Sequence, residues 1–105
     1  MGRKKIKDRI VLRFVKKLRK KFRIEKIILF GSRATGDYLK ESDYDFIIVS
    51  PDFEGMFFTE RTAMLYDFWE GKQKLDALCY TPKEFEEKKK QISIVREALK
   101  HGIEL

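Results

Sequence analysis

The first 23 residues follow a pattern in which hydrophobic positions recur at four-residue steps and Lys or Arg fills most positions between them. This spacing places the hydrophobic side chains on one side of a helix. The segment therefore predicts an amphipathic helix whose apolar side packs on a core. The hydrophobic set is Ile6, Ile10, Val11, Phe14, Val15, Leu18 and Phe22.

Three short hydrophobic runs have the length and bounds of strands. Residues 27–30 are continuously apolar and are closed by Gly31, which predicts a strand buried on both faces. Residues 43–49 (DYDFIIV) predict a second strand, and residues 73–80 predict a third. Residues 33–41 lack an apolar run and predict a short helix or loop between the first two strands.

Two further helices are expected in the second half of the chain. Residues 59–70 carry hydrophobic residues at helical spacing, with Thr59 as the expected N-cap and Gly71 as the stop. Residues 81–84 (TPKE) have the composition of a capping box, and an apolar stripe continues from there to Gly102. The stripe contains Phe85, Ile92, Val95 and Leu99. The element order predicts an α/β (α+β) fold, a small mixed sheet flanked by helices.

Composition limits the class of protein. A chain of 105 residues, 43% hydrophobic and 39% charged, is expected to form one globular domain over residues 1–105. No apolar run approaches the roughly 20 residues of a membrane span, and the N-terminus lacks the apolar segment of a signal peptide. A cytoplasmic protein is therefore expected. Cys79 is the single cysteine, which excludes an intramolecular disulfide and predicts a buried, inert thiol.

The positive charge is concentrated in the N-terminal segment. Residues 1–23 hold twelve Lys and Arg against Asp8, and the remaining chain has a net charge of −4. The pattern favours a helix packed on the core with a solvated polar face. Binding of RNA, of a membrane surface or of an acidic partner by this basic helix stays open.

The candidate chemistry lies at the ends of the predicted strands. Gly31 and Ser32 follow the first strand, where a glycine lets the backbone approach phosphate oxygens. Asp43 and Asp45 begin the second strand, and alternation along it points both carboxylates to one face. Asp76 interrupts the apolar third strand, where an unpaired carboxylate would be costly.

Three aspartates brought together would repel one another unless a divalent cation neutralised them. Hard oxygen ligands select Mg²⁺, with Mn²⁺ as the alternative. Two ions could bind the attacking and leaving oxygens of a displacement at a nucleotide α-phosphorus. A phosphate-binding turn beside paired aspartates therefore predicts nucleotidyl transfer.

Residues 29–49 (LFGSRATGDYLKESDYDFIIV) closely resemble the signature of minimal nucleotidyltransferases of the polymerase-beta-like superfamily: Gly-Ser, ten residues, then Asp-x-Asp. The resemblance implies that Asp43 and Asp45 hold two metal ions and that Asp76 completes the metal site. It also implies that Gly31 and Ser32 hold the triphosphate of ATP.

Stand-alone proteins similar to this chain are antitoxins paired with a HEPN-domain ribonuclease toxin. The resemblance implies transfer of AMP from ATP to a tyrosine of that toxin. Because only 29 residues follow Asp76, the acceptor is expected to be bound largely by another molecule. The alternative functions are an antitoxin that acts by contact alone and nucleotidyl transfer to an RNA or a small molecule. Whether the protein forms a homo-oligomer stays open.

Neighbouring residues have less specific signals. Arg33 is a candidate phosphate ligand with an exposed surface role as the equal alternative, and Thr35 stands where relatives often carry a basic residue. Lys40 is expected at the surface.

Tyr38 and Tyr44 are expected in the core, with base stacking as the alternative. Core positions are also expected for most of the aromatic set Phe57, Phe58, Phe68 and Trp69, with a partner interface as the alternative, and His101 is expected to be an ordinary helix residue.

Overall fold

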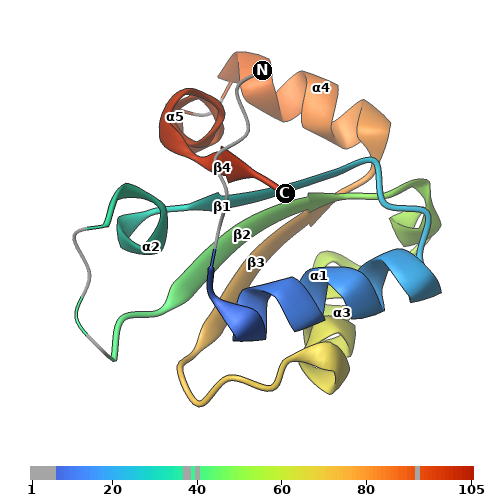
Figure 1. The fold of residues 1–105 in the computed structure, drawn as a ribbon. Coiled ribbons are helices and arrows are strands. Elements are labelled where there is room, and N and C mark those ends of the chain that lie inside the picture. The colour runs from blue at the N-terminus through green and yellow to red at the C-terminus, as the bar shows by residue number, and fades with distance from the viewer. Residues whose placement is uncertain (1–6, 37–38, 40, 92) are drawn as a thin grey trace.

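A four-stranded mixed sheet forms the centre of the molecule (Figure 1). The computed structural model describes residues 7–36, 39, 41–91 and 93–105. The strand order is β3-β2-β1-β4, where β2 and β3 are parallel and β1 is antiparallel to both of its neighbours. The strands are β1 (Lys26–Phe30), β2 (Tyr44–Val49), β3 (Leu75–Tyr80) and β4 (Ile103–Glu104). The predicted mixed sheet is confirmed, and β3 and β4 are its edge strands.

Helices cover both faces of this sheet. α1 (Arg9–Lys21) and α3 (Phe58–Leu65) lie on one face, and α4 (Pro82–Gln91) and α5 (Ser93–His101) lie on the other (Figure 1). The four-residue helix α2 (Ser32–Thr35) follows the end of β1. Two 3₁₀ turns, Pro51–Phe53 and Tyr66–Phe68, flank α3. The order of elements agrees with the prediction, except that the last predicted helix is two helices and that β4 was not predicted.

Alternation along the strands divides the core into two parts. On β2, Phe46 and Ile48 face α1 and α3, whereas Ile47 and Val49 face α4 and α5. The first core also takes the buried side of α1, which the sequence pattern predicted: Val11, Phe14 and Leu18. Because both faces are covered, the central strands are apolar on both sides.

The start of α1 depends on Asp8. Its Oδ1 accepts hydrogen bonds from the N–H groups of Ile10 and Val11, at 2.9 and 3.3 Å, which is N-cap geometry. The helix ends at Lys21, so Phe22 lies beyond it and packs on the core from the C-cap position. Ile6, which the pattern also placed on the apolar side, is outside the described residues.

The third predicted helix differs from the observed one at both ends. α3 begins at Phe58, so Thr59 is inside the helix and is not its N-cap. The carboxylate of Glu60 instead accepts the N–H of Phe57, at 2.9 Å. The last turn is a 3₁₀ turn, not an α-helix. The expectation of core positions is confirmed for Phe68 and Trp69, which pack on the first core, and is wrong for the exposed Phe57 and Phe58.

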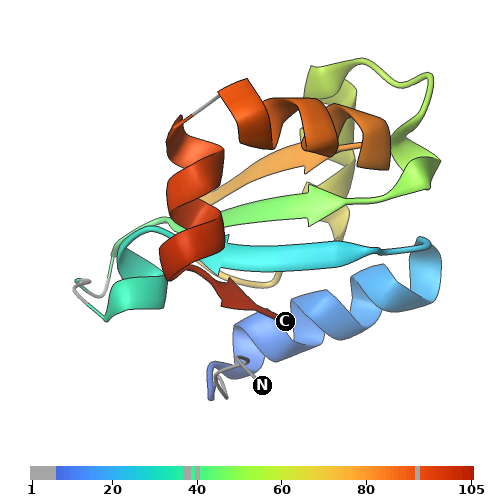
Figure 2. The same ribbon diagram turned by 90° about the horizontal axis from the view of Figure 1, so that it is seen from above.

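The last predicted helix is two helices. α4 ends at Gln91 and α5 begins at Ser93. The two helices lie at a marked angle to one another over the same face (Figure 2). Phe85 of α4 and Val95 and Ala98 of α5 thereby reach the same core. Ile92, expected on the apolar stripe, is outside the described residues.

The predicted capping box at the start of α4 is confirmed. The N–H of Thr81 donates to Glu84 at 2.9 Å, and the N–H of Glu84 donates to the Thr81 hydroxyl at 3.2 Å.

Cys79 is buried, as expected. Within the described ranges, no helix has the length and apolar character needed to cross a bilayer.

Candidate functional site

A row of three residues crosses the sheet at the site. Phe30 of β1 is the register partner of Asp45 of β2, and Asp45 is the partner of Asp76 of β3. Adjacent strands are roughly 4.8 Å apart, so the two carboxylates are side by side. Leu75 and Ala77 point into the first core, so Asp76 points to the α4/α5 face. The structure therefore brings two predicted metal ligands together on one face.

The electrostatics of Asp45 show how close the carboxylates are. The pKa of Asp45 is raised above 3.8, first by burial and then by the negative charges of Asp76 and Asp43, with Lys74 acting in the opposite direction. Asp45 is half-buried, whereas Asp43 and Asp76 are exposed. Asp43 comes one residue before β2. All three predicted carboxylates therefore interact, and a cation among them would relieve the repulsion.

Gly31 lies against the carboxylate of Asp45. Its φ of +73° belongs to a region that favours glycine. A Cβ built on Gly31 would be 2.5 Å from Oδ2 of Asp45. The backbone conformation thus favours glycine here, and any side chain at this position would displace the Asp45 carboxylate. The turn after β1 reaches the acidic row without an intervening side chain.

Ser32 begins α2 immediately after this turn. The carbonyl of Gly31 accepts the N–H groups of Ala34 and Thr35, at 3.0 and 3.2 Å, which fixes the turn. The N–H of Ser32 is the first of the helix and has no carbonyl one turn earlier to bond. Gly31 and Ser32 therefore present backbone beside Asp45, the arrangement expected of a phosphate-binding turn.

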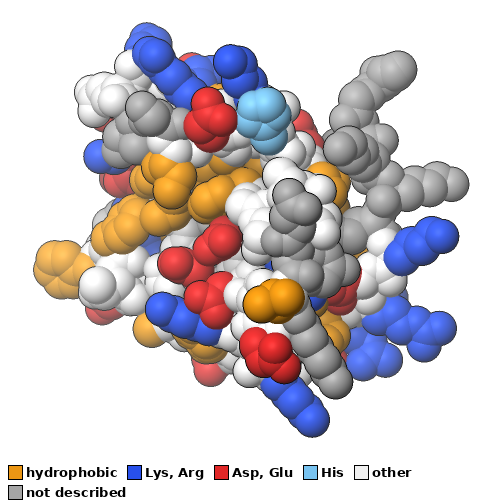
Figure 3. Space-filling view, turned by 90° about the vertical axis from the view of Figure 1, so that its left-hand side faces the viewer, with side chains coloured by type: hydrophobic (Ala, Val, Ile, Leu, Met, Phe, Trp, Pro, Cys, Tyr) orange, Lys and Arg blue, Asp and Glu red, His pale blue; other side chains and the backbone are white. Residues whose placement is uncertain are grey.

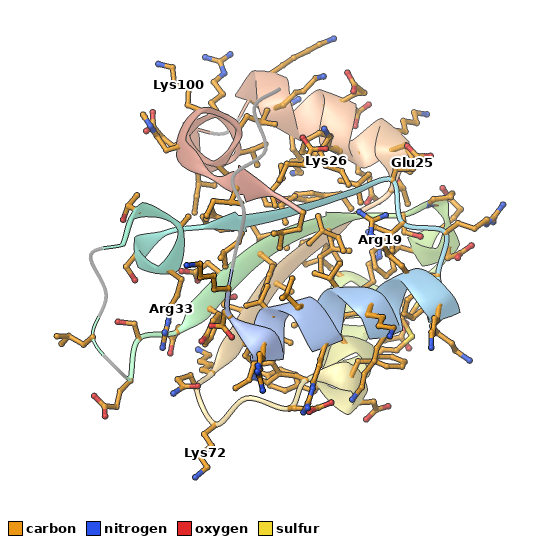
Figure 4. The ribbon with its side chains drawn as sticks, viewed as in Figure 1. Arg19, Glu25, Lys26, Arg33, Lys72 and Lys100 are labelled. Atoms are coloured by element: carbon orange, nitrogen blue, oxygen red, sulfur yellow. The ribbon has the colours of Figure 1, made fainter. Side chains whose placement is uncertain are left out.

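Arg33 points toward the residues that lead into β2 (Figure 4). Its guanidinium donates to the carbonyl of Ser42 at 3.0 Å and lies 4.1 Å from the centre of the Tyr44 ring. Both contacts are to residues next to Asp43, so Arg33 positions this aspartate. Phosphate binding by Arg33 stays a prediction.

Tyr44 is a core residue, the reading that the sequence favoured. It is 4% exposed, and its ring meets Trp69 edge to face at 4.9 Å. Its hydroxyl donates to Oδ2 of Asp8 at 2.5 Å. Asp8 therefore caps α1 and also holds the strand residue between Asp43 and Asp45. Tyr38 and Lys40 are outside the described residues.

Side chains of α3 and the turn after it satisfy the outer edge of β3. The Tyr66 hydroxyl donates to the carbonyl of Leu75 at 2.6 Å, and the Thr62 hydroxyl donates to that of Ala77 at 3.0 Å. The buried Arg61 donates to the carbonyl of Cys79 at 3.0 Å. These three hydrogen bonds hold β3, the strand that carries Asp76, and occupy carbonyl groups that could otherwise pair with another chain.

Two of these supporting residues were missed by the sequence interpretation. Asp8 had an available signal, since an Asp just before a helical apolar pattern is a common N-cap. Arg61 had none, because a charged residue on a predicted helix is normally solvated. Arg61 can be buried because its guanidinium donates to the carbonyl of Cys79 at 3.0 Å and to the carboxylate of Glu84 at 2.5 Å.

The carboxylates suit Mg²⁺ only in combination with a substrate. Among the residues that the structure describes, no three carboxylate, imidazole or thiol groups form a ready-made metal site. Asp45 and Asp76 nevertheless offer neighbouring hard oxygen donors, with Asp43 close by. Because Mg²⁺ is typically held by one or two carboxylates together with substrate phosphates, the donor set fits this ion.

Comparison with known proteins agrees with this geometry. The family model described as "Nucleotidyltransferase domain" matches residues 11–103. A relative from Methanocaldococcus jannaschii, named "Putative protein adenylyltransferase MJ0604", is 50% identical over 50 residues, which are 45% of this chain and 50% of the relative. The match thus spans half the length of that relative.

Solved structures show the same fold. A crystal structure titled as that of a "putative nucleotidyltransferase" from Sulfolobus solfataricus has a TM-score of 0.59 and 29% identity, covering 74% of this chain and 69% of its own. The BolA domain of SufE1 from Arabidopsis thaliana has a TM-score of 0.60 at 22% identity, covering 76% of this chain and 99% of its own, which shows a shared fold alone. The family match includes the turn and all three aspartates. This chain belongs to the nucleotidyltransferase domain family.

Proposed function

We propose that this protein transfers AMP from ATP to a hydroxyl group of an acceptor. The observation that carries the proposal is the contact of Gly31 with Asp45, which is itself the register partner of Asp76. A phosphate-binding turn, a half-buried carboxylate and an exposed carboxylate thus follow one another within a few ångströms. In the proposed reaction, the turn binds the triphosphate, Asp45 lies at the reacting phosphorus and Asp76 lies on the acceptor side.

The proposed reaction is an in-line displacement. The acceptor oxygen forms a bond to the α-phosphorus while the bond from this phosphorus to the bridging oxygen breaks, and pyrophosphate leaves. Asp76 is exposed on an edge strand, so its carboxylate can take the proton of an acceptor hydroxyl that arrives from solvent. The backbone at Gly31 and Ser32 holds the β- and γ-phosphates during this step.

Two Mg²⁺ ions, or Mn²⁺ in their place, would be held by Asp43, Asp45 and Asp76. The ions would neutralise phosphate charge and align the reacting oxygens. The protein supports the segments that carry these carboxylates. Arg33 binds the carbonyl of Ser42 next to Asp43, and α3 together with the turn after it fixes the strand of Asp76.

For the acceptor, we propose a tyrosine of a HEPN-domain ribonuclease toxin, which gives this protein the role of an antitoxin. Two observations support a protein acceptor. The Methanocaldococcus jannaschii relative carries the name of a putative protein adenylyltransferase, and stand-alone proteins that resemble this chain are antitoxins in HEPN pairs. AMPylation of the tyrosine would silence the toxin by blocking its active site.

Intact-mass analysis tests the proposal. Any HEPN-domain protein encoded beside this one would be incubated with ATP, Mg²⁺ and either the wild-type protein or Asp45→Asn. Asp67→Asn, at an exposed aspartate on the turn after α3, is the matched control. Mass gains in steps of one AMP with wild type and Asp67→Asn, and not with Asp45→Asn, are expected. A complex that binds ATP but gives no gain would favour the contact-only antitoxin.

A further inference from the structure

The side of α1 that faces solvent carries a row of positive charge. The row lies opposite the buried residues of the helix, and its members follow one another at steps of three or four residues. All members of this basic row are exposed: Arg9, Arg13, Lys16 and Lys20. Figure 3 shows Lys and Arg side chains gathered at the right-hand edge of the molecule, on the side of α1 and apart from the acidic side chains near the centre.

The fold does not account for the basic row. Like charges three or four residues apart on a helix repel one another, and Arg9 is in the first turn, where the helix dipole disfavours a cation. Arg13 is paired with Glu70 at 3.1 Å, and Glu70 also binds Lys17 beside the row. In the described part of the chain, the other members of the row take part in no ion pair. The row therefore reduces the stability of the helix and leaves positive charge uncompensated.

The surroundings of the basic row argue against a lipid or a protein partner. The apolar side of α1 is at most 1% exposed at Val11, Phe14 and Leu18, so the helix cannot insert that side into a bilayer. Protein interfaces are enriched in aromatic residues and depleted of Lys. The exposed side of α1 has no aromatic residue, and Leu12 is its one exposed large hydrophobic residue. The composition of this surface instead matches a partner that presents phosphate groups.

We propose that the basic row binds the phosphate backbone of a double-stranded nucleic acid. From Arg9 to Lys20 the row extends about 17 Å, at about 1.5 Å per residue. One strand of a duplex carries a phosphate charge about every 3.4 Å along the axis, so about five phosphates lie along that length. Proteins that bind single strands use aromatic side chains on which bases stack, and the exposed side of α1 has none. The row therefore fits a duplex backbone better than a single strand.

The basic row and the carboxylates of the candidate site lie on opposite faces of the sheet. α1 packs on the face to which Phe46 points. Asp76 and, by alternation along β2, Asp45 point to the α4/α5 face. A duplex bound along α1 is thus held away from the reacting centre, where it fixes the location of the protein and does not serve as the acceptor. The inference does not depend on the proposed nucleotidyl transfer.

Two double variants of equal charge separate the basic row from the net charge of the protein. Lys16→Glu/Lys20→Glu reverses two charges of the row. Lys83→Glu/Lys90→Glu reverses two exposed charges of α4, on the other face of the sheet. Fluorescence anisotropy would give the dissociation constants of wild type and both variants for labelled duplex DNA, duplex RNA, single-stranded RNA and a poly-glutamate peptide. Each titration would be run at several salt concentrations.

Wild type is expected to bind duplex DNA, duplex RNA or both, with an affinity that falls about 100-fold between about 50 and 200 mM salt. The variant of the row should bind at least tenfold more weakly than the α4 variant. Equal weakening by the two variants would overturn the proposal, because net charge would then explain the binding. Tighter binding of single-stranded RNA or of poly-glutamate than of either duplex would also overturn it, as would the absence of duplex binding at 50 mM salt.

Glu70 provides a variant that should gain affinity. Glu70→Gln removes the carboxylate that pairs with Arg13 and Lys17, so both cations become available to phosphates. Glu87→Gln, at an exposed glutamate of α4, is the control of equal charge. Glu70→Gln should bind the duplex about threefold more tightly than Glu87→Gln and should show a steeper salt dependence. Equal affinities of these two variants would contradict duplex binding at the basic row.

Discussion

Gly31 and Asp45 are in contact: the position that a Cβ would take on Gly31 is 2.5 Å from Oδ2 of Asp45. Gly31 directly follows β1 and Asp45 is on β2, and the antiparallel pairing of Phe30 with Asp45 brings the two residues together. The contact joins the proposed phosphate-binding turn to the half-buried carboxylate of the acidic row. The Gly-Ser motif and the Asp-x-Asp motif therefore form one structural unit. A side chain at position 31 would displace the carboxylate of Asp45.

Gly31→Ala is predicted to impair catalysis much more than stability. The side chain of Asp45 can move away from the new methyl group, so the unfolding free energy should fall by about 1 kcal/mol, mainly from the strained φ. The displaced carboxylate should lower kcat/KM about 100-fold. Gly55→Ala is the control, because Gly55 has a φ of +82° and no atom within 4 Å of its Cβ position. It should lose similar stability and retain activity.

The hydrophobic pattern predicted the main elements because each central strand is covered on both faces. The apolar runs of β1 and β2 and the one-sided pattern of α1 are local properties of the chain. β4 was not predicted, because two residues pair there only as a result of tertiary packing against Ile28 and Leu29. The separation of α4 from α5 has the same origin, since it lets both helices reach the same core.

The residues of the candidate site were predicted wherever the local sequence carries a signal, which for Asp76 is a charge within an otherwise apolar run. Gly31, Asp43 and Asp45 have a fixed spacing, and alternation along β2 gave the direction of the aspartates. The supporting contacts join distant segments and leave no local pattern. Tyr44 bonds Asp8, 36 residues away, and Arg61 bonds Glu84, 23 residues away.

The hydrogen bond from Tyr44 to Asp8 is predicted to couple α1 to the acidic strand. Tyr44→Phe should lower the unfolding free energy by about 1 kcal/mol, and Asp8→Ala by about 2 kcal/mol because it also removes the N-cap. The double variant should lose less than the sum of the two, by roughly 1 kcal/mol, in a denaturation cycle. Strictly additive losses would show that the bond contributes nothing.

Acid should weaken the contribution of Glu84 to stability. Hydrogen bonds from Arg61, and secondarily from the Thr81 N–H, hold the pKa of Glu84 below its ordinary 4.5. A carboxyl with a lower pKa in the folded state stabilises the fold above the unfolded pKa and loses that effect as pH falls through the folded value. Since the side chain is 40% exposed, the effect should be below about 1 kcal/mol.

The comparison of wild type with Glu84→Gln by urea unfolding checks this sign. The stability difference should be constant near neutral pH and should shrink below about pH 4.5. In an Arg61→Met background this pH dependence should largely disappear. A difference that grows as pH falls would contradict the proposed role of Arg61.

The thiol of Cys79 should be unreactive in the folded protein. Burial raises its pKa to about 12, so almost no thiolate exists at pH 8. Ellman's reagent at pH 8 should find less than a tenth of an equivalent of thiol over an hour in native buffer, and one equivalent in guanidinium chloride. Rapid labelling of the native protein would mean that β3 opens readily.

Transfer of label from ATP tests the central claim most directly. The protein and the proposed HEPN acceptor would be incubated with Mg²⁺ and with ATP labelled at either the α- or the γ-phosphate, using wild type, Asp45→Asn and Asp67→Asn. Protein-bound label is expected from α-labelled ATP alone, at least 100-fold reduced in Asp45→Asn and unchanged in Asp67→Asn. Label from γ-labelled ATP, or equal transfer by Asp45→Asn, would contradict nucleotidyl transfer at the Asp45–Asp76 pair.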